Sequence, residues 1–340
     1  MPLIGPIATA LPPHRLAQRQ LAESLPGGRE RATALAASTR IRERALACPL
    51  PWYMEPHGHR DRAEAFARVG LQLVEQAAAD ALRMAGVPAQ EVASIVLVST
   101  TGVAAPSLDA RLMNRLPFAP GTRRVPVWGL GCAGGVGGLN LAAALARAEP
   151  ASHHLLVCVE LCSLLFDLPG VAAGDRKALV AASLFGDGCA ATVVSGDATG
   201  ASGLAHLRES RHLFPATERV MGWDVADGNL DVVISPEIPG LVASTMAQLT
   251  HGICGGRPPD HWVLHPGGAK VLDAYRGALG LDGSRLQASE DTLRDYGNMS
   301  SPTVLFALRR AAAQAAPGER LLAAALGPGF ASEMAMLEAP

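Results

Sequence analysis

Cys132 stands in a run of glycines, while His265 precedes a Pro-Gly-Gly turn and Asn298 follows a glycine. A cysteine at the sharp start of a helix meets free backbone N–H groups and the positive end of the helix dipole, and both favour a thiolate. A cysteine nucleophile also needs a histidine and an amide or carboxylate from elsewhere in the chain. The three side chains therefore predict covalent catalysis through a thioester on Cys132.

Three other interpretations of the stretch GLGCAGGVGG at 129–138 remain open. Its glycines match the phosphate loop G-x-G-x-x-G, but Glu149 precedes the next expected strand instead of following it. Residues 125–146 carry no charge and are long enough to span a bilayer, although glycines and a proline make this a poor helix. A buried structural cysteine is the third. The joint presence of His265 and Asn298 favours the nucleophile.

The elements that would position these side chains repeat along the chain. SIVLVSTTG resembles HWVLHPGG as a buried strand and polar turn, and the helix after Cys132 resembles the helix after Asn298. RLLAAALGPG is expected to correspond to GCAATVVSG. We therefore predict an α/β fold of two βαβ-rich halves, residues 1–200 carrying the cysteine and residues 201–340 carrying the histidine and asparagine. The turns that carry Cys132, His265 and Asn298 should face one shared cleft.

Composition excludes several classes of function. The chain has 29 Lys and Arg against 31 Asp and Glu, and only 4% aromatic residues, which disfavours nucleic-acid binding. The start MPLIGPIATALPPHR lacks a basic opening, so we expect no secretory signal, a cytoplasmic protein and six free cysteines. No metal is expected, because a metal site needs three or four placed ligands and the histidine pairs lack partners: His57/His59 and His153/His154.

Five ordered motifs carry a family resemblance: GLGCAGG, ASLFGDGCAA, WVLHPGGAKVLD, YGNMSSPTVLFAL and LGPGF. Together they resemble the type III polyketide synthases, the chalcone-synthase-like branch of the thiolase fold. The resemblance implies an αβαβα fold and a homodimer without a transmembrane segment. It also implies acyl-CoA and malonyl-CoA as substrates, with no further cofactor.

The resemblance assigns roles to the matching residues. Cys132 is the acyl-accepting cysteine, His265 the histidine that holds it as a thiolate, and Phe185 the gatekeeping phenylalanine. His265 and Asn298 would donate hydrogen bonds to the malonyl thioester oxygen and stabilise the enolate left by decarboxylation. That carbanion would attack the acyl group on Cys132, and the longer chain would return for another round.

Departures from the plant enzymes bear on specificity. A second gatekeeping phenylalanine aligns with Val232, two initiation-pocket threonines with Cys162 and Leu165, and an interface methionine with Ala105. Smaller side chains at two of these walls imply a wider or longer cavity. The segment at 221–239 resembles bacterial members that extend fatty acyl-CoA starters into alkylpyrones or alkylresorcinols, so we expect a fatty acyl starter.

The remaining assignments concern substrate and CoA contacts. Glu160 and Ser300 complete the predicted substrate-binding set. The predicted CoA contacts are Arg42 and Arg44 in STRIRERAL, an expected Arg-rich helix or loop, and Gly267 and Gly268. Two alternatives remain: a single-round ketoacyl-ACP synthase, disfavoured by HPGG and GNMSS, and an inactive acyl-CoA-binding scaffold, disfavoured by the complete Cys/His/Asn set.

Overall fold

The computed structural model describes residues 1–24, 33, 37–226 and 230–340. In this described part, one ten-stranded sheet forms the frame of the molecule. Strand β2 (Ala8–Ala10) pairs with β8 beside the main path. The main path runs in the order β12 (His261–Leu264), β13 (Arg320–Gly327), β14 (Ala331–Glu338), β9 (Leu204–Leu213), β1 (Leu3–Ile4), β8 (Asp187–Ser195), β7 (His153–Leu161), β5 (Val92–Val98) and β6 (Arg123–Val127).

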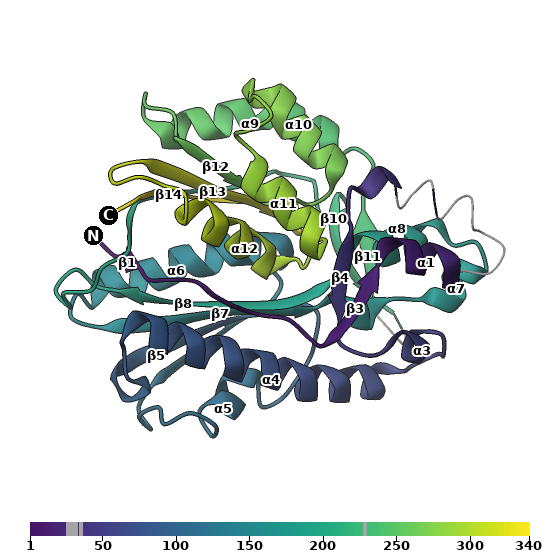
Figure 1. Ribbon diagram of the computed structural model, residues 1–340, viewed down its shortest axis with the longest axis horizontal. Helices are drawn as coiled ribbons and strands as arrows, with labels where there is room; N and C mark the ends of the chain where they lie inside the picture. Colours follow the sequence, from purple (N-terminus) through teal and green to yellow (C-terminus); the bar gives the residue numbers. More distant parts are fainter. Residues whose placement is uncertain (25–32, 34–36, 227–229) are drawn as a thin grey trace.

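Helices form three layers around and between the strands (Figure 1). The outer layer of the first half holds α4 (His59–Ala85) and α5 (Leu108–Leu112). The short turn η1 (Ala89–Glu91) lies between α4 and β5 in the chain. The middle layer holds α6 (Gly134–Ala148) and α12 (Ser301–Ala312). The outer layer of the second half holds α9 (Ile238–Cys254) and α10 (Ala269–Leu279), with α11 (Gln287–Tyr296) leading into α12. The predicted αβαβα layering is confirmed.

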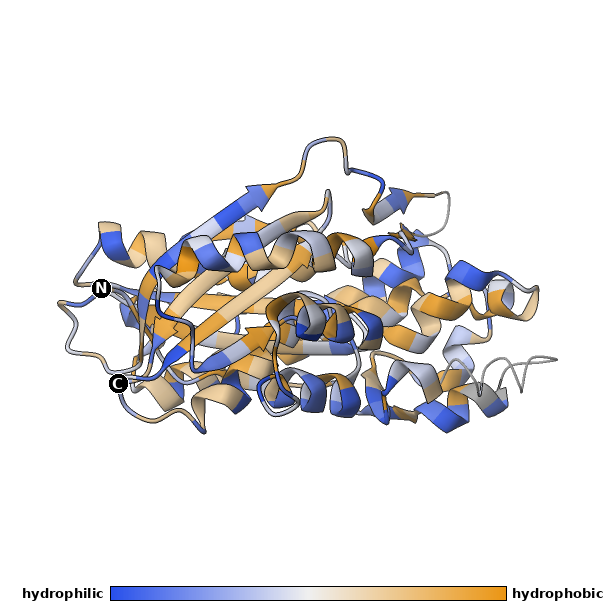
Figure 2. Ribbon diagram, turned by 90° about the horizontal axis from the view of Figure 1, so that it is seen from above, coloured by the Kyte–Doolittle hydropathy of each residue, from blue (hydrophilic) through white to orange (hydrophobic). Residues whose placement is uncertain are grey.

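The central part of strand β7, residues 155–159, is entirely apolar. Side chains alternate between the two faces of a strand, so both faces must be apolar when helices cover both. Leu155 and Val157 join the buried cluster around α4, whereas Leu156 and Cys158 join the cluster around α6 and α12. Figure 2 shows the same distribution, with apolar strands inside and polar residues on the outer helices.

The duplication is confirmed, with one correction to the correspondence of its strands. In the first half β5 pairs in parallel with β7, and β7 pairs antiparallel with β8. In the second half β12 pairs in parallel with β13, and β13 pairs antiparallel with β14. RLLAAALGPG, which forms β13, therefore corresponds to β7 and not to GCAATVVSG. Short apolar strands look alike in sequence, and only their pairing distinguishes them.

The two halves share one continuous sheet. Strand β1 pairs with β8 on one side and with β9 on the other, so the N-terminus joins the halves. The proposed division between residues 200 and 201 falls in the connection from β8 to β9. This connection leaves each half its own parallel pair and its own outer helices.

Smaller elements gather at one end of the molecule (Figure 1). A hairpin of β10 (Met221–Val225) and β11 (Leu230–Ile234) stands apart from the main sheet. A second hairpin pairs β3 (His14–Ala17) with β4 (Glu43–Leu46), so STRIRERAL ends in a strand and not in the expected helix or loop. The helices and turns at this end are α1 (Gln18–Ser24), α3 (Leu50–Tyr53), α7 (Leu168–Ala172), α8 (Arg176–Leu184) and η3 (Cys162–Leu165).

Candidate active site

Cys132 lies in a single 3-10 turn, η2 (Gly131–Ala133), between strand β6 and helix α6. Gly131 has a φ of 46°, and a Cβ at this position would lie 2.7 Å from the ring of Pro328. A side chain here would be strained by the left-handed backbone and would collide with that ring. The glycine before the nucleophile is therefore required by the sharpness of the turn.

Gly135 explains the glycines after the nucleophile. A Cβ on Gly135 would lie 2.3 Å from the backbone oxygen of Ser301, the first residue of α12. Helices α6 and α12 can approach this closely only where one of them lacks a side chain. The close approach brings the two duplicated turns together, so that Cys132 and Asn298 meet across the middle layer.

Asn298 is held by backbone hydrogen bonds to the loop that carries Phe185. The Asn298 N–H donates to the carbonyl oxygen of Leu184 at 3.0 Å, and the Gly186 N–H donates to the carbonyl oxygen of Asn298 at 2.9 Å. The Asn298 amide donates from Nδ2 to the Gly267 carbonyl oxygen at 3.2 Å. Its Oδ1 accepts from the backbone N–H of Ser300 at 2.8 Å and lies 4.0 Å from the Sγ of Cys132.

His265 lies directly after β12, where its backbone N–H donates to the carbonyl oxygen of Ala324 at 2.8 Å. Both ring nitrogens are buried, and neither has a hydrogen-bond partner among the described residues. Buried polar groups are normally paired, because an unpaired one loses its interactions with water. The ring therefore retains both nitrogens for a substrate or for the thiol.

Burial acts on Cys132 and His265 in the direction that removes charge. Burial raises the pKa of the Cys132 thiol to about 11, with the side-chain contacts to Ser300 and Asn298 acting in the opposite direction. Burial lowers the pKa of the His265 imidazole to about 3. The structure thus favours a neutral thiol and a neutral imidazole, whereas the sequence argument expected a standing thiolate. A neutral imidazole keeps one nitrogen free to accept a proton.

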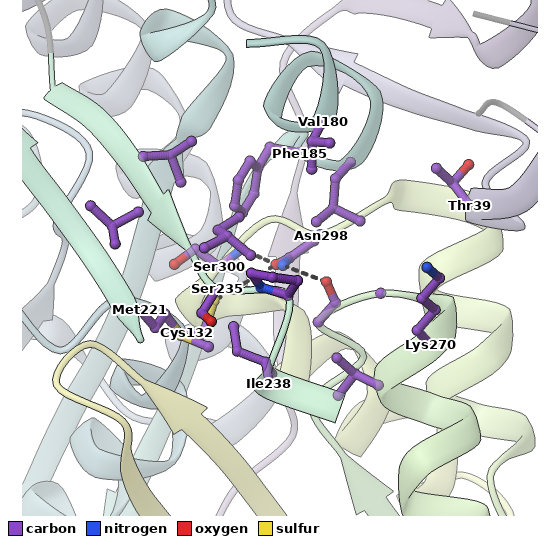
Figure 3. Close-up of a pocket in the computed structure, with 18 of the residues that line it drawn as sticks. Thr39, Cys132, Val180, Phe185, Met221, Ser235, Ile238, Lys270, Asn298 and Ser300 are labelled. Carbon is purple, nitrogen blue, oxygen red and sulfur yellow. Dashed lines mark hydrogen bonds between the residues drawn. The ribbon is translucent and has the colours of Figure 1, made fainter. Parts of the chain in front are cut away.

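One cavity of about 730 Å³ brings the predicted catalytic residues together. Such a volume is typical of a site for a small organic ligand. Figure 3 shows Cys132, Asn298 and Ser300 at its centre, with Phe185 on one side and Lys270 on the other. The lining includes eight residues singled out from the sequence: Cys132, Phe185, Val232, His265, Gly267, Gly268, Asn298 and Ser300.

Several predicted contacts lie elsewhere. Cys162 is 1% exposed in η3, and Leu165, at the end of the same turn, is half-buried. Neither is among the residues that line this cavity. Glu160 is also absent from the lining, because its carboxylate is fully buried among backbone N–H groups.

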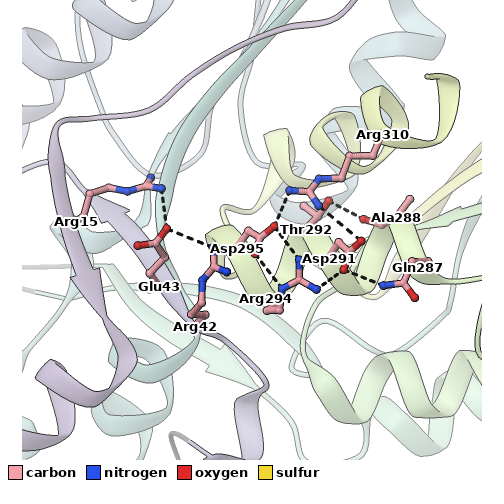
Figure 4. A network of polar contacts seen from close by, with 10 residues as sticks. All are labelled: Arg15, Arg42, Glu43, Gln287, Ala288, Asp291, Thr292, Arg294, Asp295 and Arg310. Carbon is pink, nitrogen blue, oxygen red and sulfur yellow. Dashed lines mark hydrogen bonds and ion pairs between the residues drawn. The ribbon is translucent and has the colours of Figure 1, made fainter. Parts of the chain in front are cut away.

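The two predicted CoA arginines do not line the cavity, and their surroundings differ. Arg42 is exposed but forms ion pairs with Asp295 and Glu43, within a network that fixes the β3–β4 hairpin to α11 (Figure 4). Arg44 is fully buried, and its side chain lies beside Gly186 and Gly297. Burial lowers the pKa of its guanidinium to about 9, against the attraction of Asp187. A phosphate at the surface cannot reach Arg44.

Three of the lining residues that were not foreseen could contact substrate or CoA. Lys270 and Arg176 are exposed cations at the cavity, and Trp223 faces Phe185 with ring centroids 6.0 Å apart. The position of Lys270 just after HPGG was a usable signal, because the turn must lie at the site. Trp223 gave no such signal, since only the pairing of β10 with β11 places it opposite Val232.

Other features of the described ranges bear on the class of protein. No group of three or more His, Cys, Asp or Glu in the described residues is arranged to hold a metal ion. All six cysteines are free thiols, as expected. No helix in the described ranges combines the length and the apolar character needed to cross a bilayer.

Comparison with known proteins agrees with this geometry. Residues 50–198 match the family model for the N-terminal domain of chalcone and stilbene synthases, and residues 207–339 match the C-terminal domain. The chain is 38% identical over 355 residues to 1,3,6,8-tetrahydroxynaphthalene synthase of Streptomyces peucetius subsp. caesius, covering 98% of this chain and 92% of the relative. It is 32% identical over 328 residues to the alpha-pyrone synthesis polyketide synthase-like Pks18 of Mycobacterium tuberculosis, covering 91% and 82%.

A solved structure shares the whole fold. The 1,3,6,8-tetrahydroxynaphthalene synthase from Streptomyces coelicolor A3(2), a bacterial type III polyketide synthase, superposes with a TM-score of 0.90 at 30% identity and 99% coverage of both chains. Both halves of the chain thus match one family in sequence and in structure. The chain belongs to the chalcone and stilbene synthase family and is a type III polyketide synthase, an acyltransferase that uses CoA thioesters in decarboxylative Claisen condensation.

Proposed function

We propose that Cys132 carries the growing polyketide, while His265 and Asn298 activate malonyl-CoA beside it. The observation that carries this proposal is the single cavity lined by all three side chains, which come from both halves of the chain. The two turns are 166 residues apart in sequence, yet the Sγ of Cys132 lies 4.0 Å from Oδ1 of Asn298.

Acylation begins with attack of Cys132 Sγ on the thioester carbonyl of the starter. The thiol proton passes to the neutral imidazole of His265, so the two unfavourable charges form together as the C–S bond forms. The bond from the carbonyl carbon to CoA sulfur breaks, and the CoA thiolate takes the proton from His265. The site then holds an acyl thioester and a neutral histidine again.

Condensation uses two hydrogen-bond donors that the described residues leave unpaired, one on Asn298 and one on His265. Asn298 Nδ2 spends one N–H on Gly267, which leaves its second N–H free, and His265 has an unpaired ring N–H. Both can donate to the malonyl thioester oxygen while CO₂ leaves and the enolate forms. The enolate carbon attacks the acyl carbonyl carbon, the bond from that carbon to Sγ breaks, and Cys132 leaves as a thiolate. The extended chain is then a thioester of the former malonyl CoA, and Cys132 accepts it again with release of that CoA.

The character of the cavity supports an apolar starter such as a fatty acyl group. Its outer wall comes from α7, α8, the β10–β11 hairpin and the start of α9. It is lined largely by aliphatic side chains, which include Val171, Leu179, Val180, Val232, Ile234 and Ile238. Burial of each methylene against such a wall contributes about 0.8 kcal/mol. We infer that the product is a pyrone or resorcinol bearing the starter as its alkyl chain.

A second candidate is an aromatic product built from malonyl-CoA alone. It is favoured by the 38% identity to a 1,3,6,8-tetrahydroxynaphthalene synthase and by Trp223, which faces Phe185 across the cavity. Mass spectrometry of products from malonyl-CoA alone, and with acyl-CoA of two to sixteen carbons, separates the candidates. Alkyl-bearing products with several extensions support the first; only a starter-free product supports the second; a single extension supports a ketoacyl-synthase-like reaction.

Val232 is expected to set the preference for starter length. Phenylalanine at this position would close space used only by long chains, so Val232→Phe should shift kcat/KM towards shorter acyl-CoA. Loss of room for four carbons corresponds to ~3 kcal/mol, about two orders of magnitude. Val225→Phe on the same hairpin is the control, because Val225 is 77% exposed and does not line the cavity. Equal slowing of all starters by Val232→Phe would contradict the assignment.

A homodimer is supported by two exposed apolar side chains in neighbouring loops. Val103 is 69% exposed and Trp128 is 59% exposed, and Ala105 is exposed in the same region. Their loops follow β5 and β6, which are joined here by a hydrogen bond from Ser99 N to Val127 O. Light scattering at micromolar concentration should give twice the chain mass, 70.4 kDa against 35.2 kDa for one chain; a monomer would contradict the dimer.

The free cysteines bear on the cellular location, and Lys270 bears on the path of CoA into the cavity. Free cysteines are typical of a reducing compartment, which supports a cytoplasmic location. Lys270, next to the HPGG turn, supports a CoA path over Gly267 and Gly268.

A further inference from the structure

Glu160 is a buried carboxylate that accepts hydrogen bonds from two separate segments. It stands near the end of β7 and is fully buried. Its oxygens accept from the backbone N–H of Thr100 at 2.9 and 3.1 Å and of Thr101 at 2.9 Å. They also accept from the Thr101 hydroxyl at 2.7 Å and the Ser301 hydroxyl at 2.9 Å.

These bonds continue to both halves of the active site. The hydroxyl of Thr100 accepts from the backbone N–H of Gly131 at 3.0 Å, and Gly131 is the residue before Cys132. Ser301 begins α12, three residues after Asn298. One carboxylate thus connects the loop after β5, the nucleophile's turn and the start of the helix behind the Asn298 loop.

We propose that Glu160 is a positioning residue that fixes Cys132 relative to Asn298, and does not bind substrate. This inference rests on the proposed roles of Cys132 and Asn298. Since Glu160 does not line the cavity, it acts only through the segments that it connects. Reacting groups must be held within a fraction of an ångström, and misplacement by about 1 Å can cost ~10²-fold in rate.

The chemistry of the site requires an acceptor with two oxygens. Among the described residues no cation forms an ion pair with Glu160, so hydrogen-bond donors alone surround it. Two of these donors are backbone N–H groups, which cannot reverse. The Thr100 N–H contacts both oxygens of Glu160, so a glutamine in either orientation would place its NH₂ group against this N–H.

The test compares Glu160→Gln with Asp109→Asn. Asp109 is also a fully buried carboxylate, but it pairs with Arg124 and contacts none of the segments named above. We expect Glu160→Gln to lower kcat of product formation by ten- to a hundredfold, with KM for malonyl-CoA within threefold of wild type. Asp109→Asn should keep kcat within about twofold. An unchanged kcat in Glu160→Gln, or a raised KM with kcat intact, would overturn the proposal.

A pH profile separates positioning from general destabilisation. Burial raises the pKa of the Cys132 thiol to about 11, and the negative charge of Glu160 acts in the same direction. Burial also raises the pKa of the Glu160 carboxyl itself, against the hydrogen bonds from Thr101, Thr100 and Ser301. Removal of the charge should move the inflection of Cys132 alkylation by iodoacetamide to lower pH, measured on the Cys132 peptide by mass spectrometry. A slower enzyme with an unmoved inflection has only a damaged fold, and that result would overturn the proposal.

A second variant keeps the test decisive if Glu160→Gln does not fold. Thr100→Val removes only the hydroxyl that accepts from Gly131, and it leaves the buried charge in place. We expect a fall in kcat of several-fold at unchanged KM, and an unchanged kcat would contradict the inference. Failure of the proposed function itself is distinguishable, because Cys132→Ala would then remain active.

Discussion

Replacement of Cys132 by alanine is expected to abolish polyketide formation, with a loss of about 10⁴-fold or more, as for other covalent nucleophiles. Without Sγ no thioester can form on the enzyme, and the enolate has no acyl group to attack. His265 and Asn298 remain in place, so slow decarboxylation of malonyl-CoA should persist. The two activities are measured separately, as extended products and as acetyl-CoA from malonyl-CoA.

Cys162→Ala is the matched control for this loss. Cys162 is a fully buried thiol close enough for Cys132 to influence its pKa, yet it does not line the cavity. Its replacement should leave product formation within a few-fold of wild type. Condensation at an undiminished rate in Cys132→Ala would contradict the covalent role of Cys132.

Asn298→Ala is expected to slow malonyl-CoA decarboxylation by ~10²–10³-fold. The substitution removes a donor aimed at the enolate oxygen, and loss of one such donor typically costs this much in rate. Acylation of Cys132 by the starter should be affected less, because Sγ and His265 remain. Asn298→Asp tests the donor itself, since the carboxylate keeps the oxygen but replaces the N–H with negative charge.

Asn140→Ala provides the control for Asn298. Asn140 is also a buried amide, held in α6 by hydrogen bonds to Glu333 and to the backbone oxygen of Met334. Its loss should lower the thermal midpoint without a comparable fall in decarboxylation. Equal rates of decarboxylation in Asn298→Ala and wild type would remove Asn298 from the oxyanion site.

Local patterns in the sequence were sufficient for the parts of the site formed by turns. Cys132 and Asn298 could be found because each turn carries glycine and begins a helix, and the duplication places them at equivalent positions. His265 could be found because a strand must end where HPGG begins. These signals are local, and burial of neighbouring strands on both faces made the layers predictable as well.

Long-range packing decided the features that the sequence did not reveal. Arg44 looks like a surface cation, and only its location between the Gly186 and Gly297 loops shows it to be buried. The pairing of β10 with β11 places Trp223 beside Val232, which no local pattern shows. Glu160 was assigned to substrate for the same reason: the backbone N–H groups that surround it lie about 60 residues earlier in the chain.

The central claim is that Cys132 carries the acyl chain, and the most direct test is to observe the chain there. The enzyme is incubated with an acyl-CoA in the absence of malonyl-CoA, quenched in acid, digested and analysed by mass spectrometry. We predict that the peptide containing Cys132 gains the mass of the acyl group and loses it on treatment with hydroxylamine. An acyl group on a different residue, or product formation with Cys132 never acylated, would contradict the account.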